Sequence, residues 1–283
     1  MQVKALAKLN LTLDVLGIRE DGYHEMKMVM QSITLADTLT IAPGTGESIR
    51  VATNFDFLPD GDKNLAAIAA RAYWKARGEE PRPLDITIEK CIPVCAGMAG
   101  GSSDAAAVLR GLNEQSENPL SMEELARVGE AVGSDVPYCV LGCTALAEGR
   151  GELLTPLPPM PKCWVVVCKP DFSISTPALF AQIDNVKITR RPDTAGVLEA
   201  LEKGDLLGVA RRLYNVFEDV LPERQKGKIN AIKTTLIQYG ALGAAMSGTG
   251  PTVFGLFQDE RTARSAYEKL AGEYTETYLA QTV

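Results

Sequence analysis

The stretch that decides the fold is Ile92-Pro-Val-Cys-Ala-Gly-Met-Ala-Gly-Gly-Ser-Ser-Asp-Ala-Ala-Ala-Val-Leu-Arg-Gly-Leu112. Its glycines, Gly97, Gly100 and Gly101, come just before an alanine-rich segment that is typical of a helix. Glycine lets the backbone approach a ligand closely and adopt positive φ. A helix N-terminus presents unpaired N–H groups that suit phosphate. The spacing therefore predicts either a phosphate-binding loop or a tight strand-to-helix turn without a ligand, and it leaves both open.

The two common nucleotide-binding signatures are absent from the chain. Neither Gly-x-x-x-x-Gly-Lys-Ser/Thr nor Gly-x-Gly-x-x-Gly occurs anywhere in the 283 residues. This disfavours the P-loop, Rossmann and protein-kinase interpretations of the glycine-rich stretch.

The residues on both sides of this stretch are predicted to form further strands and helices. Residues 3–15 alternate apolar and polar side chains, which predicts a strand and places Lys8 and Asn10 side by side on its polar face. A second strand is expected over 26–42, with a break near Asp37. Further strands are expected near 85–90, 143–148, 164–168, 244–246, 253–257 and 275–281. Helices are expected near 64–77, in the alanine-rich segment that follows Gly101, from 121, and at 176–182, 194–202, 205–213, 225–239 and 260–271.

These elements predict an α+β protein of two domains. The length fits about two domains, and the proline-rich stretch 155–161 is the expected boundary. The predicted domains are therefore 1–155 and 156–283.

Composition excludes several classes of protein. The formal net charge is −7 and basic residues do not cluster, so nucleic-acid binding is disfavoured. No apolar run reaches 18 residues, and no signal-peptide core is present at the N-terminus, so we expect a cytoplasmic protein that does not bind membranes. The single histidine, His24, excludes Cys₂His₂ zinc sites and His-Glu-x-x-His metalloproteases. The six cysteines are interpreted as small apolar residues rather than as metal ligands or disulfides.

Three motifs, in order, resemble those of the GHMP kinases. They are Ala5-Leu-Ala-Lys-Leu-Asn-Leu11, the segment from Pro93 to Ala106, and Met246-Ser-Gly-Thr-Gly-Pro-Thr-Val-Phe254. The resemblance implies a two-domain GHMP kinase fold. Its N-terminal α/β domain would bind ATP at a left-handed-crossover type nucleotide site, and its C-terminal domain would be a ferredoxin-like α+β domain. It also implies an ATP-dependent phosphotransferase with an alcohol acceptor, assisted by Mg²⁺. The family commonly has Leu and Gly where this chain has Met98 and Ala99.

Other segments resemble one branch of that family. They are 7–11, 19–24, 133–137, 147–152, 175–177 and Asn215-x-Phe-Glu218. This branch phosphorylates the 2-hydroxyl of a cytidylyl-methylerythritol in the non-mevalonate isoprenoid pathway. The implied partners are that small molecule and ATP, for a monomer or weak homodimer. The alternatives are another GHMP small-molecule kinase, of mevalonate or homoserine type, and a non-catalytic nucleotide-binding paralogue.

The resemblance assigns two catalytic residues. Asp135 matches the catalytic base, which accepts the acceptor's proton late in a loose transition state; the alternative is an ordinary helix-capping aspartate. Lys8 matches the catalytic lysine, which would offset developing negative charge and keep Asp135 ionised; the alternative is a solvent-facing lysine on a strand.

The resemblance also assigns binding residues. The ATP loop comprises Pro93, Val94, Cys95, Ala96, Gly97, Met98, Ala99, Gly100, Gly101, Ser102 and Ser103. The acceptor set is Asn10, Tyr23, His24, Lys90, Thr176 and Phe180, in which the aromatic groups would stack on cytosine. Lys90 could instead be simply exposed, and Thr176 could be a helix cap. Ser103 and Glu124 are candidates for Mg²⁺ ligands, but no ligand is assigned. Gly248-Thr-Gly250 is expected to be a turn of backbone donors, or else a plain hairpin turn.

Overall fold

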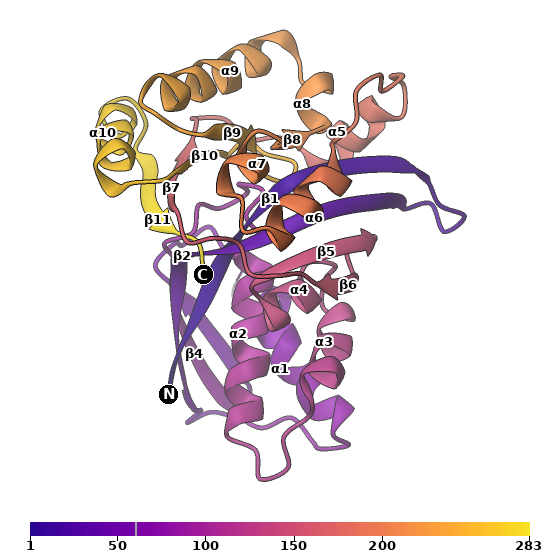
Figure 1. The fold of residues 1–283 in the computed structure, drawn as a ribbon. Helices are drawn as coiled ribbons and strands as arrows, with labels where there is room; N and C mark the ends of the chain where they lie inside the picture. The colour runs from indigo at the N-terminus through magenta and orange to yellow at the C-terminus, as the bar shows by residue number, and fades with distance from the viewer. Residues whose placement is uncertain (60) are drawn as a thin grey trace. The chain divides into compact units, whose positions relative to one another are not determined.

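The computed structural model describes residues 1–59 and 61–283. The chain forms two compact units, each assembled from separate segments. The first comprises 1–7, 36–92 and 99–142, and the second comprises 8–35, 93–98 and 143–283. Strands β1 (Gln2–Ile18) and β2 (His24–Pro43) are long, and each contributes a segment to both units (Figure 1).

The first unit is a small sheet with helices. The end of β2 pairs antiparallel with β4, from Thr38 opposite Glu89 to Pro43 opposite Leu84, and β4 pairs in parallel with β3. Helix α1 packs against α2, and α2 also contacts α4 (Figure 1). The elements are β3 (Ile49–Thr53), a 3-10 turn (Gly61–Lys63), α1 (Leu65–Ala76), β4 (Leu84–Glu89), α2 (Gly100–Glu114), α3 (Met122–Glu130) and α4 (Val136–Leu141).

The second unit contains a four-stranded antiparallel sheet in the order β11-β7-β10-β9. Helices separate β7 from β9, and α10 separates β10 from β11, which gives the β-α-β-β-α-β order of a ferredoxin-like domain. The elements are β7 (Trp164–Lys169), α5 (Thr176–Ile183), α6 (Thr194–Glu202), α7 (Leu206–Ala210), α8 (Phe217–Val220), α9 (Glu223–Gln238), β9 (Gly243–Met246), β10 (Val253–Phe257), α10 (Glu260–Ala271) and β11 (Glu276–Gln281). The ferredoxin-like expectation is confirmed.

The same unit also contains strand pairs formed with β1 and β2. The first half of β2 pairs antiparallel with β5 (Thr144–Gly149), which pairs with β6 (Leu153–Pro156). The short strand β8 (Tyr214–Asn215) pairs in parallel with β1, with Thr12 opposite Tyr214.

Most predicted elements are present, and the differences have clear causes. The expected break in β2 is wrong: the strand runs through Asp37, whose carboxylate is buried but well hydrogen-bonded. The pattern also missed β3, β6, β8 and α8, because elements of two to five residues carry little periodicity. Helix α7 covers only part of the expected 205–213.

None of the six cysteines forms a disulfide. Cys139, Cys163 and Cys168 are buried, as expected of small apolar side chains, and burial raises the pKa of Cys163 to about 11. The other three are exposed, so the apolar interpretation is wrong for them; they are Cys91, Cys95 and Cys143.

Candidate functional site

The polar face of β1 carries a buried pair. Lys8 Nζ donates to Asn10 Oδ1 at 2.7 Å, and the two residues are 4% and 0% exposed. The main chain of Lys8 is also fixed, because its N–H donates to the carbonyl of Met98 at 3.2 Å. The alternation of polar and apolar residues correctly predicted that the Lys8 and Asn10 side chains lie together. The solvent-facing alternative for Lys8 is wrong, because the side chain is buried.

Ser247 joins this strand to the first half of the glycine-rich loop. Its hydroxyl donates to Gly97 O at 3.0 Å and accepts from Asn10 N–H at 3.3 Å. A Cβ on Gly97 would lie 2.2 Å from Ser247 O, and Gly97 has φ +73°, so only glycine fits this position. No role was predicted for Ser247, because its partners are remote along the chain.

The turn after Ser247 connects β9 to β10. Gly250 N–H donates to Ser247 O and Ser247 N–H donates to Thr252 O, both at 2.9 Å, so the turn closes a hairpin. Thr249 Oγ1 lies 2.9 Å from Thr176 Oγ1 on α5. Ser175, not Thr176, caps α5, because its hydroxyl accepts from Ala178 N–H. The capping alternative for Thr176 is therefore wrong.

Two of the predicted aromatic groups form a stack. The rings of His24 and Phe180 lie 4.4 Å apart between centroids at 30°, and His24 Nε2 is 2.7 Å from Asp184 Oδ1. Phe217 meets Phe180 edge-on, with 5.0 Å between centroids. Tyr23 is 56% exposed, and the guanidinium of Arg150 lies over its ring. The structure thus assembles an aromatic surface with a polar edge.

In the first unit, helix α2 begins from a left-handed residue. Ala99 is its N-cap with φ +58° and ψ +30°, and its carbonyl accepts from Ser103 N–H. Ala99 stands at the position where the resembling family commonly has glycine, the residue that adopts this conformation at low cost. Ser103 is buried, and its hydroxyl donates to Leu6 O.

Lys90 lies beside this helix start in a buried ionic cluster. Its ammonium contacts Asp37 at 2.5 Å and Asp104 at 2.6 Å, and a Cβ on Gly100 would lie 3.4 Å from Lys90 Nζ. Asp37 also accepts from the N–H groups of Cys91 and Ile92. The exposed alternative for Lys90 is wrong.

This cluster changes how its groups titrate. Burial lowers the pKa of Lys90, but Asp104 and Asp37 outweigh that effect and raise it overall. Burial raises the pKa of Asp104 to about 8, with Lys90 opposing the rise and Asp37 adding to it. Asp104 Oδ1 is buried without a hydrogen-bond partner. A proton on Asp104 would leave the cluster neutral, with one ammonium balancing one carboxylate.

Asp135 stands at the start of α4. It is the N-cap residue by position, with φ −84° and ψ −11°, but its side chain makes no capping hydrogen bond. A capping aspartate has extended backbone and accepts from the first helical turn. The capping alternative for Asp135 is therefore wrong.

The two candidate Mg²⁺ ligands both make hydrogen bonds within the protein. Glu124 forms a capping box with Ser121: its carboxylate accepts from Ser121 N–H, and that hydrogen bond lowers the pKa of Glu124. The Ser103 hydroxyl is buried against Leu6 O. Among residues 1–59 and 61–283, no group of three His, Cys, Asp or Glu could hold a metal ion. We therefore assign no protein ligand to Mg²⁺.

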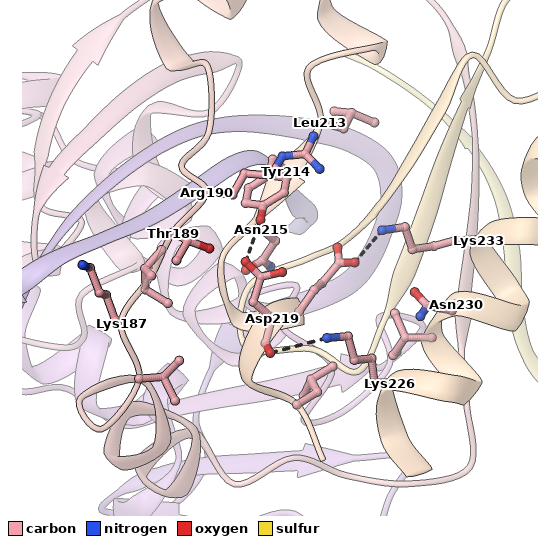
Figure 2. Close-up of a pocket in the computed structure, with 15 residues that line it drawn as sticks. Lys187, Thr189, Arg190, Leu213, Tyr214, Asn215, Asp219, Lys226, Asn230 and Lys233 are labelled. Carbon is pink, nitrogen blue, oxygen red and sulfur yellow. Dashed lines mark hydrogen bonds and ion pairs between the residues drawn. The ribbon is translucent and has the colours of Figure 1, made fainter. Parts of the chain in front are cut away.

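A pocket lined by other residues lies in the second unit. It measures about 440 Å³, and side chains from the loop before α6, from β8 and from α9 line it (Figure 2). Tyr214 OH donates to Asp219, and Lys233 pairs with Glu218. Its walls are thus held by internal hydrogen bonds.

In the described part of the chain, no helix has the length and apolar character needed to cross a membrane.

Comparisons with known proteins place these features in context. Family models described as "GHMP kinases N terminal domain" and "GHMP kinases C terminal" match residues 64–143 and 197–276. A 4-diphosphocytidyl-2-C-methyl-D-erythritol kinase of Alkaliphilus metalliredigens is 44% identical over 99% of this chain and 96% of its own. A crystal structure of a 4-(cytidine 5'-diphospho)-2C-methyl-D-erythritol kinase matches with a TM-score of 0.82 and 32% identity, covering 100% of this chain and 99% of the other. A homoserine kinase from Cytophaga hutchinsonii matches with a TM-score of 0.71 at 16% identity, covering 100% and 94%, which shows the shared fold.

Proposed function

This chain belongs to the GHMP kinase family, in its branch of 4-diphosphocytidyl-2-C-methyl-D-erythritol kinases, and we propose that it phosphorylates the 2-hydroxyl of that cytidylyl alcohol. Like its family, it is an ATP-dependent phosphotransferase with an alcohol acceptor. The observation that carries the acceptor assignment is the stack of His24 on Phe180, with Asp184 at the His24 ring edge. A planar base stacks on such a surface, and the imidazole offers it a hydrogen bond.

Asp135 is our proposed catalytic base. Its carboxylate would accept the proton of the 2-hydroxyl as the bond to the γ-phosphorus forms, while the β–γ bridging oxygen leaves with ADP. The position of Asp135 in the segment Gly133-Ser-Asp-Val-Pro137, which resembles the segment of the family that carries the base, supports this role.

Lys8 is proposed to stabilise the negative charge that develops as the phosphoryl group is transferred. It is a buried cation, and Asn10 fixes its ammonium from one side. A preorganised charge in a buried setting stabilises developing negative charge far better than one in water. Asn10, Tyr23 and Thr176 are proposed acceptor contacts.

The loop from Pro93 to Ser103 is our proposed ATP site. Glycine at 97 and the left-handed Ala99 turn the chain into the N-terminus of α2, whose free N–H groups suit phosphate oxygens. Lys90 would act on nucleotide charge, and its ammonium already contacts Asp37 and Asp104. Mg²⁺, bound together with ATP, would neutralise part of the phosphate charge.

We also propose two sequence domains and an assembly state for this chain. Residues 1–155 would form the ATP-binding sequence domain and 156–283 the C-terminal one. The two family matches, which fall on either side of residue 155, support this division. The two compact units of the structure differ from these sequence domains, because they are defined by contacts in space and both include a segment of β1 and of β2. A monomer or weak homodimer remains our expectation.

A panel of acceptors tests the proposed function. ADP release from ATP and Mg²⁺ would be measured with the cytidylyl-methylerythritol, mevalonate, homoserine and galactose as separate acceptors. We expect turnover on the cytidylyl acceptor alone. Turnover on mevalonate or homoserine instead would contradict the roles of His24 and Phe180. ATP binding without turnover on any acceptor would favour a non-catalytic paralogue.

A further inference from the structure

The segment Asn215-Val-Phe-Glu218 connects two parts of the proposed site that lie far apart in sequence. Asn215 is 1% exposed, and its Nδ2 donates to Met246 O at 2.8 Å and to Gly248 O at 2.7 Å. Its Oδ1 accepts from Phe217 N–H at 3.0 Å. Both donors and the acceptor of one buried amide are thus used, and two of the three bonds hold the backbone that flanks Ser247.

Glu218 holds the same backbone from its other side. Its Oε1 accepts from Met246 N–H at 2.8 Å, and its Oε2 pairs with Lys233 on α9. Both backbone polar groups of Met246 are therefore bound by one four-residue segment. The outer face of this segment lines the pocket of Figure 2, where Lys233 and Asn215 are labelled.

Phe217 extends from the segment toward the aromatic surface. It is fully buried, and its ring meets the edge of Phe180, which stacks on His24. One short segment therefore contacts the backbone of Met246 and Gly248, on both sides of Ser247, through Asn215 and Glu218, and the aromatic pair through Phe217.

We propose that Asn215, Phe217 and Glu218 are positioning residues that hold the Ser247–Gly250 turn and the His24–Phe180 pair in one rigid frame. This inference rests on the proposed function, in which the turn supports Asn10 and the glycine-rich loop and the aromatic pair binds the acceptor base. The frame keeps the acceptor hydroxyl aligned for transfer once its base is bound. A displacement of about 1 Å costs about 10²-fold in rate at such a site.

Asn215→Asp is the main test variant. It keeps the shape and the acceptor for Phe217 N–H, but turns a donor into an oxygen that faces two carbonyls. We expect kcat to fall by about 10- to 100-fold. Asp219→Asn is the matched control, because Asp219 lies beside Glu218 and its carboxylate accepts from Tyr214 OH, away from the turn. It should retain wild-type kinetics.

Two Glu218 variants test the frame independently. Glu218→Gln keeps an oxygen for Met246 N–H, whereas Glu218→Leu leaves that N–H without its partner. We expect Gln to retain kcat within about threefold and Leu to lose about tenfold or more. This pair carries the test if Asn215→Asp does not fold. Equal kcat for Gln and Leu would overturn the proposal.

Phe217→Leu tests the acceptor half of the frame. It removes the ring edge that supports Phe180 while keeping an apolar side chain. We expect the KM for the cytidylyl acceptor to rise about three- to tenfold with the KM for ATP unchanged, since aromatic pairs contribute about 0.5–1.5 kcal/mol. Equal increases in both KM values would contradict this division.

Hydrogen exchange separates failure of the frame from failure of the function. Amide exchange in a peptide covering 243–254 would be measured without substrate. Asn215→Asp and Glu218→Leu should speed it at least about tenfold relative to Asp219→Asn, because the turn loses its hydrogen bonds. Unchanged exchange, or faster exchange with wild-type kcat, would overturn the proposal. If the wild type shows no turnover, the proposed function fails, and the exchange result still decides whether the segment holds the turn.

Discussion

At the scale of single residues, the buried polar side chains carry most of the information. A charged or amide group inside a protein is costly unless it is hydrogen-bonded, so each needs a reason to be there. The Lys8 ammonium donates a hydrogen bond to Asn10 on β1, and the Lys90 ammonium contacts Asp37 and Asp104. Asp135 differs from an ordinary helix-cap aspartate in its backbone angles and in lacking the capping bond.

Asp135→Asn should abolish most activity without unfolding the protein. An amide cannot accept the hydroxyl proton, so we expect kcat to fall by about 10²- to 10⁴-fold. The melting temperature should stay close to the wild-type value, because asparagine has the size and shape of aspartate and the start of α4 has no side-chain capping bond to lose. Glu123→Gln, an exposed substitution in the first turn of α3, is the control and should leave kcat unchanged. An Asp135→Asn enzyme within threefold of wild-type kcat would rule out this base.

Asp104 should make stability fall as pH rises. Its pKa is raised to about 8 in the folded protein, above its ordinary value of 3.8, so the folded state binds more protons between these values. Its contribution to the free energy of unfolding is full below about pH 4 and is lost as pH rises through 8. Asp104→Asn removes this titration, so urea unfolding between pH 5 and 9 should depend less on pH.

The control for this experiment lies on the same helix. Glu114→Gln changes an exposed carboxylate at the other end of α2 and should keep the wild-type pH dependence. The account of the buried cluster is wrong if Asp104→Asn and Glu114→Gln show the same slope of unfolding free energy against pH.

At the scale of elements, the start of α2 combines a strained residue with a predicted ligand site. Ala99 has φ +58°, a region that costs an alanine about 1–2 kcal/mol relative to glycine. The sequence correctly indicated a glycine-rich turn leading into a helix, and Gly97 shows why the turn needs glycine. It could not show the approach of Ser247 to Gly97, since 150 residues separate them.

Ala99→Gly should be neutral or stabilising by up to about 1 kcal/mol, because relief of the left-handed backbone offsets the entropy that glycine loses on folding. Ala72→Gly, inside α1 with ordinary helical backbone, is the matched control and should destabilise by about 1 kcal/mol. Urea unfolding measures both. Equal losses of stability in the two variants would show that position 99 is not strained in solution.

At the scale of the whole molecule, local sequence patterns predicted most helices and strands, whereas contacts between residues remote in sequence determine how the buried polar groups are paired. Alternation and capping signals located β1, α1, α3 and the strands of the ferredoxin-like sheet, because these depend on neighbouring residues. Asp37 was misread as a strand break because its partners, Lys90, Cys91 and Ile92, lie more than 50 residues away. The family motifs named the candidate site residues, but only the fold showed that Asn215 and Glu218 hold the turn of the third motif.

The most direct test of the central claim is the position of the phosphate in the product. The enzyme would be incubated with ATP, Mg²⁺ and the carbon-13-labelled cytidylyl-methylerythritol, and the product examined by NMR. We predict a new phosphomonoester whose phosphorus splits the signals of the carbon that carries the 2-hydroxyl and of its methyl group. A phosphomonoester that leaves the signals of that carbon and of its methyl group unsplit, or no phosphomonoester with this acceptor while mevalonate or homoserine is phosphorylated, would contradict the account.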